Sequence, residues 1–102
     1  MKKCGVSETI ELLGGRYKLL IIRALLFQKK PLRFGELRRE IPDVSQKTLT
    51  RNLRELESTG LLTRTAYAEV PPRVEYELTK AGAELMPVFR SMGKWADAHL
   101  DL

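Results

Sequence analysis

The sequence predicts an α+β fold that is mostly α-helical, with helices before and after one β-hairpin. Three observations support this prediction. Apolar residues recur at helical spacing through most of the chain, most clearly over residues 45–62. The spacing changes to alternation of apolar and charged residues at 74–78, VEYEL, which is typical of a half-buried strand. The Pro-Pro pair at 71–72 cannot donate to a sheet ladder, so it marks an exposed hairpin tip after a first strand at 62–68.

Residues 45–62, SQKTLTRNLRELESTGLL, predict an amphipathic helix with a signal at each end. Leu49, Leu53 and Leu56 fall at i, i+4 and i+7, which is one stripe of a helix. Ser45 stands at the N-cap position, where its hydroxyl can accept a hydrogen bond from an unpaired backbone amide. Gly60 stands where helices commonly end with a glycine.

The opposite face of this helix carries cations and hydroxyls and no acidic residue. At ~100° per residue, that face gathers five side chains: Lys47, Thr50, Arg51, Arg54 and Ser58. A helix in a DNA major groove needs such a face, because phosphates are anionic and base edges form hydrogen bonds. A surface helix exposed only to water would show the same pattern. Glu55 and Glu57 lie off this face, where we expect them to screen cations such as Arg51 and Arg54 or to cap the surface, which is a minor effect for exposed pairs.

Two helices before it complete a recognisable arrangement. Residues 16–27, RYKLLIIRALLF, are apolar on nearly every face, and their length favours a central buried helix over a buried strand. After a short strand or turn at 32–33, Phe34, Leu37 and Ile41 predict a two-turn helix over 34–41. A short helix, a tight turn at 42–44 and a longer basic helix form a helix-turn-helix. Helical hairpins without a DNA-binding role share this pattern.

The hairpin directly follows the basic helix, and such a hairpin is a wing. The order of elements therefore predicts a winged helix-turn-helix with a two-stranded wing. Arg73 follows the two prolines on this protruding hairpin, so we expect it to contact a phosphate or the minor groove. A solvated turn residue is the alternative.

Helices are also predicted at both ends of the chain. Residues 1–5 predict a loose arm, and Ser7 can cap a helix running to Leu13, which Gly14 and Gly15 end. Thr79 can cap a final helix, which Pro87 should kink or split because proline removes one internal hydrogen bond. One face of that final helix is mostly apolar and comprises Leu85, Val88, Met92, Trp95 and His99.

Composition limits the class of protein. The chain has 102 residues, so we expect one domain over 1–102. Its net charge of +5 favours anionic partners such as nucleic acid. Cys4 is the single cysteine, which rules out an internal disulfide and fits a reducing cytoplasm. No segment approaches the ~18 apolar residues of a membrane span. Glu8 and Glu11 interrupt the segment after the basic start, so we expect no signal peptide and a cytoplasmic location.

Four segments resemble the HxlR-type family of bacterial winged-helix transcriptional regulators. They are Cys4 before the first helix, GGRYKLLIIRAL at 14–25, LRFGELRREIPDVSQKTLTRNLRELESTGLLTR at 32–64 and YAEVPPRVEYELTKAGAEL at 67–85. Together they cover most of the chain, and the wing and the VSQK start of the basic helix are specific. Gly5 departs from the pattern, since many relatives carry proline there. The resemblance implies a homodimer built by the first and last helices, which presents two recognition helices to DNA.

The apolar face of the last helix agrees with a dimer, because a small monomer has little reason to expose it unless a partner covers it. Some of these side chains will instead pack on their own domain. The predicted dimer residues are Ile10, Leu13, Val88, Met92, Trp95 and His99.

The predicted DNA-binding residues divide by role. Base-edge candidates are Gln46, Lys47, Thr50 and Arg51, and phosphate candidates are Arg54, Ser58 and Thr48, with Ser45 at the helix start and Arg73 on the wing. The operator sequence, the effector and the direction of regulation do not follow from the sequence.

Cys4 is a candidate redox or electrophile switch. Lys2, Lys3 and a helix N-terminus near Ser7 all favour the thiolate, which is the reactive form. Several members of the family that the chain resembles sense oxidants or electrophiles through a cysteine at this position. The alternative is an inert thiol packed in the dimer interface.

The main alternative to a DNA-binding regulator is an enzyme, and the sequence argues against it. His99 is the single histidine, and neither a nucleophile nor an orienting acid accompanies it in the pattern. Cys4 and His99 alone cannot complete a zinc site, and we expect no cofactor and no metal. A winged-helix module that binds proteins instead of DNA is the remaining alternative. It would carry acidic or apolar residues on the recognition face, where Lys47, Arg51 and Arg54 stand.

Overall fold

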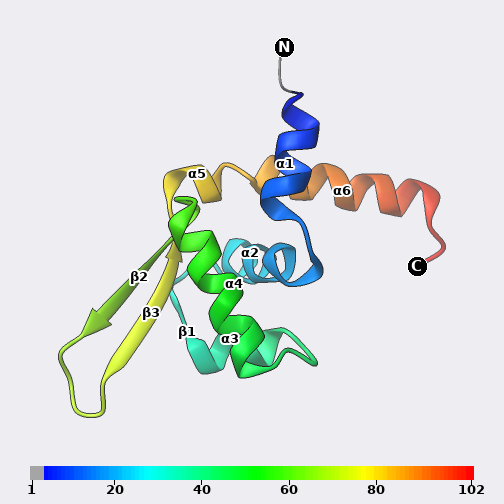
Figure 1. The fold of residues 1–102 in the computed structure, drawn as a ribbon. Helices are drawn as coiled ribbons and strands as arrows, with labels where there is room; N and C mark the ends of the chain where they lie inside the picture. Colours follow the sequence, from blue (N-terminus) through cyan, green and yellow to red (C-terminus); the bar gives the residue numbers. More distant parts are fainter. Residues whose placement is uncertain (1–3) are drawn as a thin grey trace.

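The computed structural model describes residues 4–102 as nine helices and strands in chain order (Figure 1). They are α1 (Gly5–Leu13), α2 (Arg16–Gln28), β1 (Leu32–Arg33), α3 (Phe34–Glu40), α4 (Gln46–Ser58), β2 (Leu62–Tyr67), β3 (Arg73–Leu78), α5 (Lys80–Ala83) and α6 (Met86–His99). This order confirms the predicted winged helix-turn-helix. Among these residues, no helix is both long and apolar enough to cross a membrane.

The core lies where α2, α3 and α4 meet the sheet. Helix α2 contributes Ile21 and Ile22, both fully buried, which confirms the prediction of a central helix over residues 16–27. Leu37 of α3 and the leucine stripe of α4 close over it. Burial of these side chains is the main stabilising contribution, since each is worth about 1.5–3 kcal/mol relative to an exposed position.

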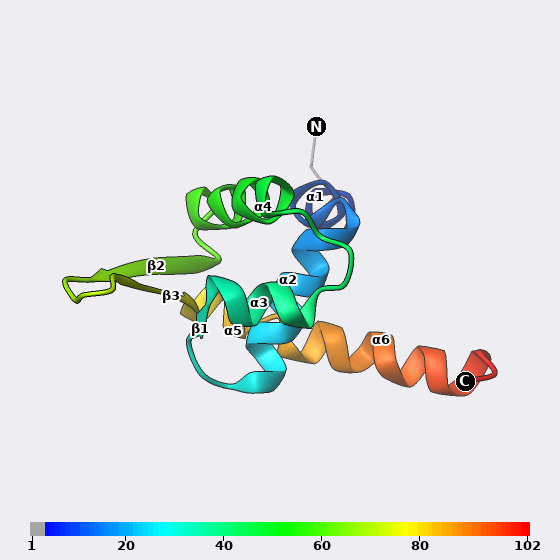
Figure 2. The same cartoon turned by 90° about the horizontal axis from the view of Figure 1, so that it is seen from below.

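The sheet has three antiparallel strands in the order β1-β3-β2. Strands β2 and β3 form the predicted wing, paired from Leu62 opposite Leu78 to Tyr67 opposite Arg73. The segment at 32–33 is a strand rather than a turn, because Leu32 pairs with Tyr76. This third strand anchors the base of the wing to the core, while the far end of the hairpin projects from the body of the protein (Figure 2).

The C-terminal segment is split, as Pro87 predicts. Thr79 caps α5, accepting a hydrogen bond on its Oγ1 from the N–H of Gly82 at 3.2 Å. Helix α6 then starts afresh at Met86, with Pro87 in its first turn, where a missing N–H costs no hydrogen bond. No residue of α6 is fully buried, and the helix extends away from the core, opposite the wing (Figure 1).

Thr79 also joins α5 to the end of the recognition helix. Its Oγ1 donates to the carbonyl of Gly60 at 2.6 Å, and its N–H donates to the carbonyl of Leu61 at 3.0 Å. The segment between α4 and β2 and the start of the C-terminal helices are therefore held together by direct hydrogen bonds.

The first helix starts three residues earlier than predicted. Cys4, not Ser7, is the N-cap residue, and its carbonyl accepts from the N–H of Glu8 at 3.0 Å. Gly5 therefore belongs to α1 rather than to a loose arm. The rest of the predicted arm, residues 1–3, lies outside the described residues. Gly14 ends the helix as predicted.

Candidate nucleic-acid interface

Helix α4 has the two end structures that its sequence predicts. The Oγ of Ser45 accepts from the N–H of Thr48 at 3.1 Å, which is an N-cap bond. At the other end, Gly60 has φ +82°, and the N–H of Leu61 donates to the carbonyl of Leu56 at 3.1 Å. This is a Schellman motif, which needs a left-handed residue such as glycine. The helix ends are therefore fixed locally, and the exposed polar face of α4 begins directly after Ser45.

The buried stripe of α4 determines how its other side chains point. Leu49, Leu53 and Leu56 are almost wholly buried against the core. Counting ~100° per residue from that stripe, the outermost positions belong to Lys47, Arg51 and Ser58, all three exposed. One flank faces the wing and carries Gln46, Thr50, Arg54 and Glu57. The other flank carries Thr48 and Glu55.

Glu55 is bonded differently from the prediction. Its carboxylate forms an ion pair with Lys18 of α2 at 2.8 Å. Lys18 lowers the pKa of Glu55 through a hydrogen bond and charge attraction, while Arg51 contributes only a smaller charge effect. The prediction that Glu55 screens the basic face was therefore wrong in its main partner. The ion pair instead joins α4 to α2, and the Glu55 carboxylate is not paired with Arg51 or Arg54.

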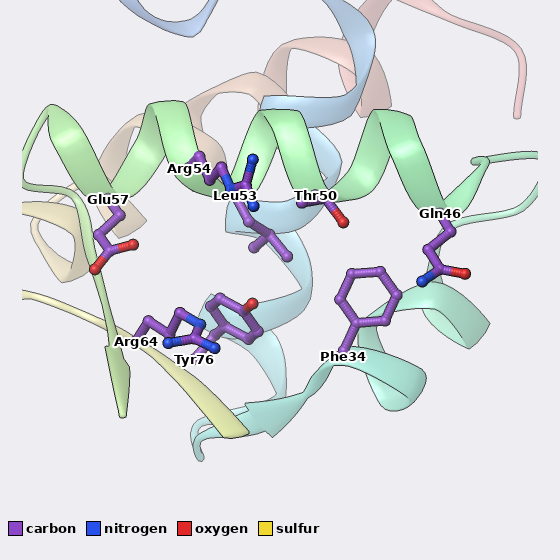
Figure 3. Close-up of a pocket in the computed structure, with 8 residues that line it drawn as sticks. All are labelled: Phe34, Gln46, Thr50, Leu53, Arg54, Glu57, Arg64 and Tyr76. Carbon is purple, nitrogen blue, oxygen red and sulfur yellow. The ribbon is translucent and has the colours of Figure 1, made fainter. Parts of the chain in front are cut away.

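A polar groove of about 540 Å³ separates the wing-facing flank of α4 from the sheet (Figure 3). We call it the α4–wing groove. Its lining combines the four flank residues and Leu53 of α4 with three residues from elsewhere: Phe34, Arg64 and Tyr76.

Sequence reasoning did not select Arg64 for this surface. A signal for it was present, since Arg64 stands two residues after the buried Leu62 and strands alternate faces. The register agrees, because Arg64 lies opposite Tyr76, a buried residue of the core face.

Arg73 lies at the start of β3 rather than on the turn itself. Its guanidinium forms ion pairs with Glu69 at 2.8 Å and with Glu75 at 3.3 Å. It also lies over the ring of Tyr67, 4.0 Å from the centroid. The Arg73 side chain is 29% exposed, and its Nε is buried with no hydrogen-bond partner among the described residues. Arg73 is therefore engaged within the wing, and its contact with DNA stays a prediction.

The terminal helices expose apolar side chains on facing surfaces. An apolar groove of about 960 Å³ runs between α1 and α6, lined among others by Ile10, Val88 and Met92. Ile10 is 65% exposed, Met92 51% and Trp95 58%. Of the predicted dimer residues, Leu13 is buried in the core of the described chain and also lines this groove.

His99 closes the end of α6 next to Trp95. The two rings stack with centroids 5.1 Å apart, and Nδ1 of His99 is 3.0 Å from the carbonyl of Trp95. The contact extends the exposed aromatic surface of α6 to the last turn of the helix.

The thiol of Cys4 is exposed at the N-terminus of α1. The backbone N–H of Ser7, and after it that of Val6, stabilises the thiolate and lowers the pKa of Cys4. Lys2 and Lys3, which the sequence also assigned to this effect, lie outside the described residues. Within residues 4–102 no cluster of three or more His, Cys, Asp or Glu side chains is placed to hold a metal ion.

The HxlR-like helix-turn-helix family model matches residues 12–102, which include the recognition helix, the wing and both C-terminal helices. The chain belongs to the HxlR-like helix-turn-helix family. An HTH-type transcriptional regulator from Methanothermobacter thermautotrophicus is 46% identical over 92 residues, which are 90% of this chain and 69% of the relative. The chain is accordingly a transcriptional regulator of the helix-turn-helix type, and its family and relatives are regulators, not enzymes.

Two regulators whose structures were solved in more than one redox form share the winged-helix fold of this chain. The redox regulator HypR in its reduced form superposes with a TM-score of 0.87 at 37% identity, covering 96% of this chain and 95% of HypR. The transcriptional regulator YodB from B. subtilis in its reduced form gives a TM-score of 0.83 at 38% identity, covering 99% and 97% of the two chains. HypR is also known in an oxidised form, and YodB after diamide treatment.

Proposed function

We propose that this protein binds operator DNA sequence-specifically as a homodimer and controls transcription by where the operator lies. The observation that carries the proposal is the division of α4 into a buried apolar face and an exposed basic face. Its leucines are buried, and its outermost face presents Lys47 and Arg51 with no carboxylate between them. Such a face matches the anionic backbone and the hydrogen-bonding edges of a major groove.

Individual roles follow from position on the helix. Residues near the N-terminus of a recognition helix contact base edges, which assigns that role to Gln46, Lys47, Thr50 and Arg51. Arg54 and Ser58 lie further along and would meet phosphates, with Thr48 on the flank. Ser45 contributes by capping α4, because its hydroxyl oxygen already accepts a hydrogen bond from the N–H of Thr48. In a two-fold dimer the two recognition helices would lie about 34–36 Å apart, one turn of DNA.

The dimer in this proposal is built by α1 and α6. Support comes from the apolar groove between these helices and from Met92 and Trp95, which are each more than half exposed. Replacing Met92 and Trp95 with aspartate should give monomers in sedimentation velocity, and these monomers should bind DNA poorly. A wild-type protein that sediments as a monomer at micromolar concentration would contradict the two-half-site arrangement.

DNA binding is tested by selecting duplexes from a random pool and then titrating the selected operator at several salt concentrations. A base contact costs about 1–3 kcal/mol when removed and relaxes specificity at one position. We expect this for Lys47→Ala or Arg51→Ala. A phosphate contact weakens all sequences and lowers the salt slope by about one. We expect this for Arg73→Ala, and an unchanged salt slope in that variant would contradict the assignment.

Lys30→Ala is the matched control, because it removes the same charge from the exposed α2–β1 connection, which lies on the far side of the molecule from α4 (Figure 2) and outside α1 and α6. If Lys47→Ala and Arg51→Ala both keep wild-type operator affinity, the recognition face is misassigned. A wild-type protein that binds no duplex at low salt would favour the protein-interaction alternative.

We further propose that Cys4 makes this regulator sensitive to oxidants or electrophiles. Support comes from its exposure, from the amide groups that lower its pKa, and from the likeness to HypR and YodB. In the oxidised state, two Cys4 thiols of a dimer would lose two protons and two electrons to the oxidant and form one disulfide.

The redox proposal is tested by comparing wild type with Cys4→Ser for operator binding, before and after diamide or a quinone. We expect only the wild type to change its affinity. If mass spectrometry shows that the thiol has reacted while operator affinity is unchanged, Cys4 is not a switch.

A further inference from the structure

Two arginines reach the α4–wing groove from opposite walls, Arg54 from α4 and Arg64 from β2 (Figure 3). Both side chains belong to exposed residues. Within residues 4–102 neither forms an ion pair or a side-chain hydrogen bond, unlike Lys18, which is bonded to Glu55. The groove therefore holds two cationic groups whose hydrogen-bond donors are available to a ligand.

Strand register separates Arg64 from the other arginine of the wing. Arg64 pairs with Tyr76, whereas Arg73 pairs with Tyr67, three residues further along β2. Because successive side chains of a strand point to opposite faces, a difference of three places the two arginines on opposite faces of the wing. Arg64 faces α4, while Arg73 faces away from it and is neutralised by Glu69 and Glu75.

We infer that the α4–wing groove holds a stretch of the DNA backbone, with Arg54 and Arg64 donating to phosphate oxygens from its two walls. The inference rests on the proposed DNA binding. If α4 lies in a major groove, the sugar-phosphate backbone that borders this groove runs along the flank of α4. Contacts to these phosphates fix the register of the protein on the duplex. The planar guanidinium suits this contact, because it can donate two parallel hydrogen bonds to one phosphate.

Glu57 allows a second test of the inference, in which the predicted change in DNA affinity has the opposite sign. Its carboxylate lines the same groove and forms no ion pair with Arg54 or Arg64 in the structure. A phosphate bound there would be repelled by this carboxylate. Removing the Glu57 charge should therefore strengthen DNA binding, whereas removing the Arg64 charge should weaken it.

The experiment titrates a random-sequence duplex and the selected operator with wild type, Arg64→Ala, Arg64→Lys and Glu57→Gln between low and physiological salt. Arg64→Ala should lose affinity equally on both duplexes and lower the salt slope by about one. Arg64→Lys should keep the slope, because it keeps the charge. Glu57→Gln should gain affinity on both duplexes. Lys30→Ala is again the control for net charge, and thermal unfolding checks that each variant is folded.

The outcomes separate this inference from the proposed function. If wild type binds DNA and Arg64→Ala keeps its affinity and slope, the groove does not hold the backbone, while recognition by α4 stands. If Arg64→Ala changes the preferred sequence without changing the slope, Arg64 contacts a base and the inference is overturned. A wild type that binds no duplex at low salt overturns the proposed function and this inference with it.

Discussion

Gly82 in α5 is a site where one added methyl group should weaken the whole protein. A Cβ at this position would overlap the backbone carbonyl oxygen of Leu61 and lie 3.0 Å from Cδ2 of Leu78. The oxygen belongs to the backbone, and it accepts the N–H of Thr79 at 3.0 Å, so it cannot move without disturbing that bond. Adding a methyl group where atoms are already in contact costs about 1–3 kcal/mol. Gly82→Ala should therefore lower the free energy of unfolding by about that amount.

The assay is urea unfolding of Gly82→Ala and wild type at one protomer concentration, because the stability of a dimer depends on concentration. Gly93→Ala is the control, since a Cβ at Gly93 in α6 would meet nothing within 4 Å. Alanine is favoured over glycine inside a helix by roughly 0.5–1 kcal/mol, so this variant should gain stability. The two substitutions should thus act in opposite directions. If Gly82→Ala is as stable as wild type, Gly82 of α5 does not contact the carbonyl of Leu61 in the α4–β2 connection.

Three further predictions test the core, an ion pair and the thiol. Leu49→Ala, at a fully buried position of α4, should cost about 2–5 kcal/mol in urea unfolding; a cost below 1 kcal/mol would contradict its place in the core. Lys18 lowers the pKa of Glu55 in the folded protein, so this pair stabilises the fold at pH values above the unfolded pKa of about 4.3. That contribution is lost as the pH falls through the lowered folded pKa. Wild type should therefore have a larger free energy of unfolding than Glu55→Gln at neutral pH, and the two values should become equal in acid. A difference in the free energy of unfolding that stays constant from pH 3 to 7 would count against the ion pair. Glu57→Gln serves as the control. Alkylation of Cys4 by iodoacetamide should show a midpoint below the value of about 8.5 for a free cysteine and return to it in urea; equal midpoints would mean that the N-terminus of α1 does not activate the thiol.

Local signals were sufficient for the recognition helix. Ser45 and Gly60 fix its two ends through bonds to residues within five positions, so the sequence alone contains both partners of each bond. The leucine stripe likewise predicts which face is buried, whatever it is buried against. The wing followed from alternation and the Pro-Pro pair, and the split of the last helix followed from Pro87. The predicted start of α1 was wrong by three residues, because Cys4 is the N-cap residue without the side-chain cap hydrogen bond that a sequence signal for a cap relies on.

The order of the elements, the buried stripe of α4 and the membership of the winged-helix class could therefore be predicted without the structure. Which charged side chains are paired with each other depends instead on the tertiary structure. Glu55 pairs with Lys18, distant in sequence, rather than with its helical neighbour Arg51. Arg73 is neutralised within the wing, and Arg64 faces α4. These outcomes depend on strand register and on how α2 packs against α4, because an ion pair forms between side chains that meet in space, and their spacing along the chain does not specify that meeting.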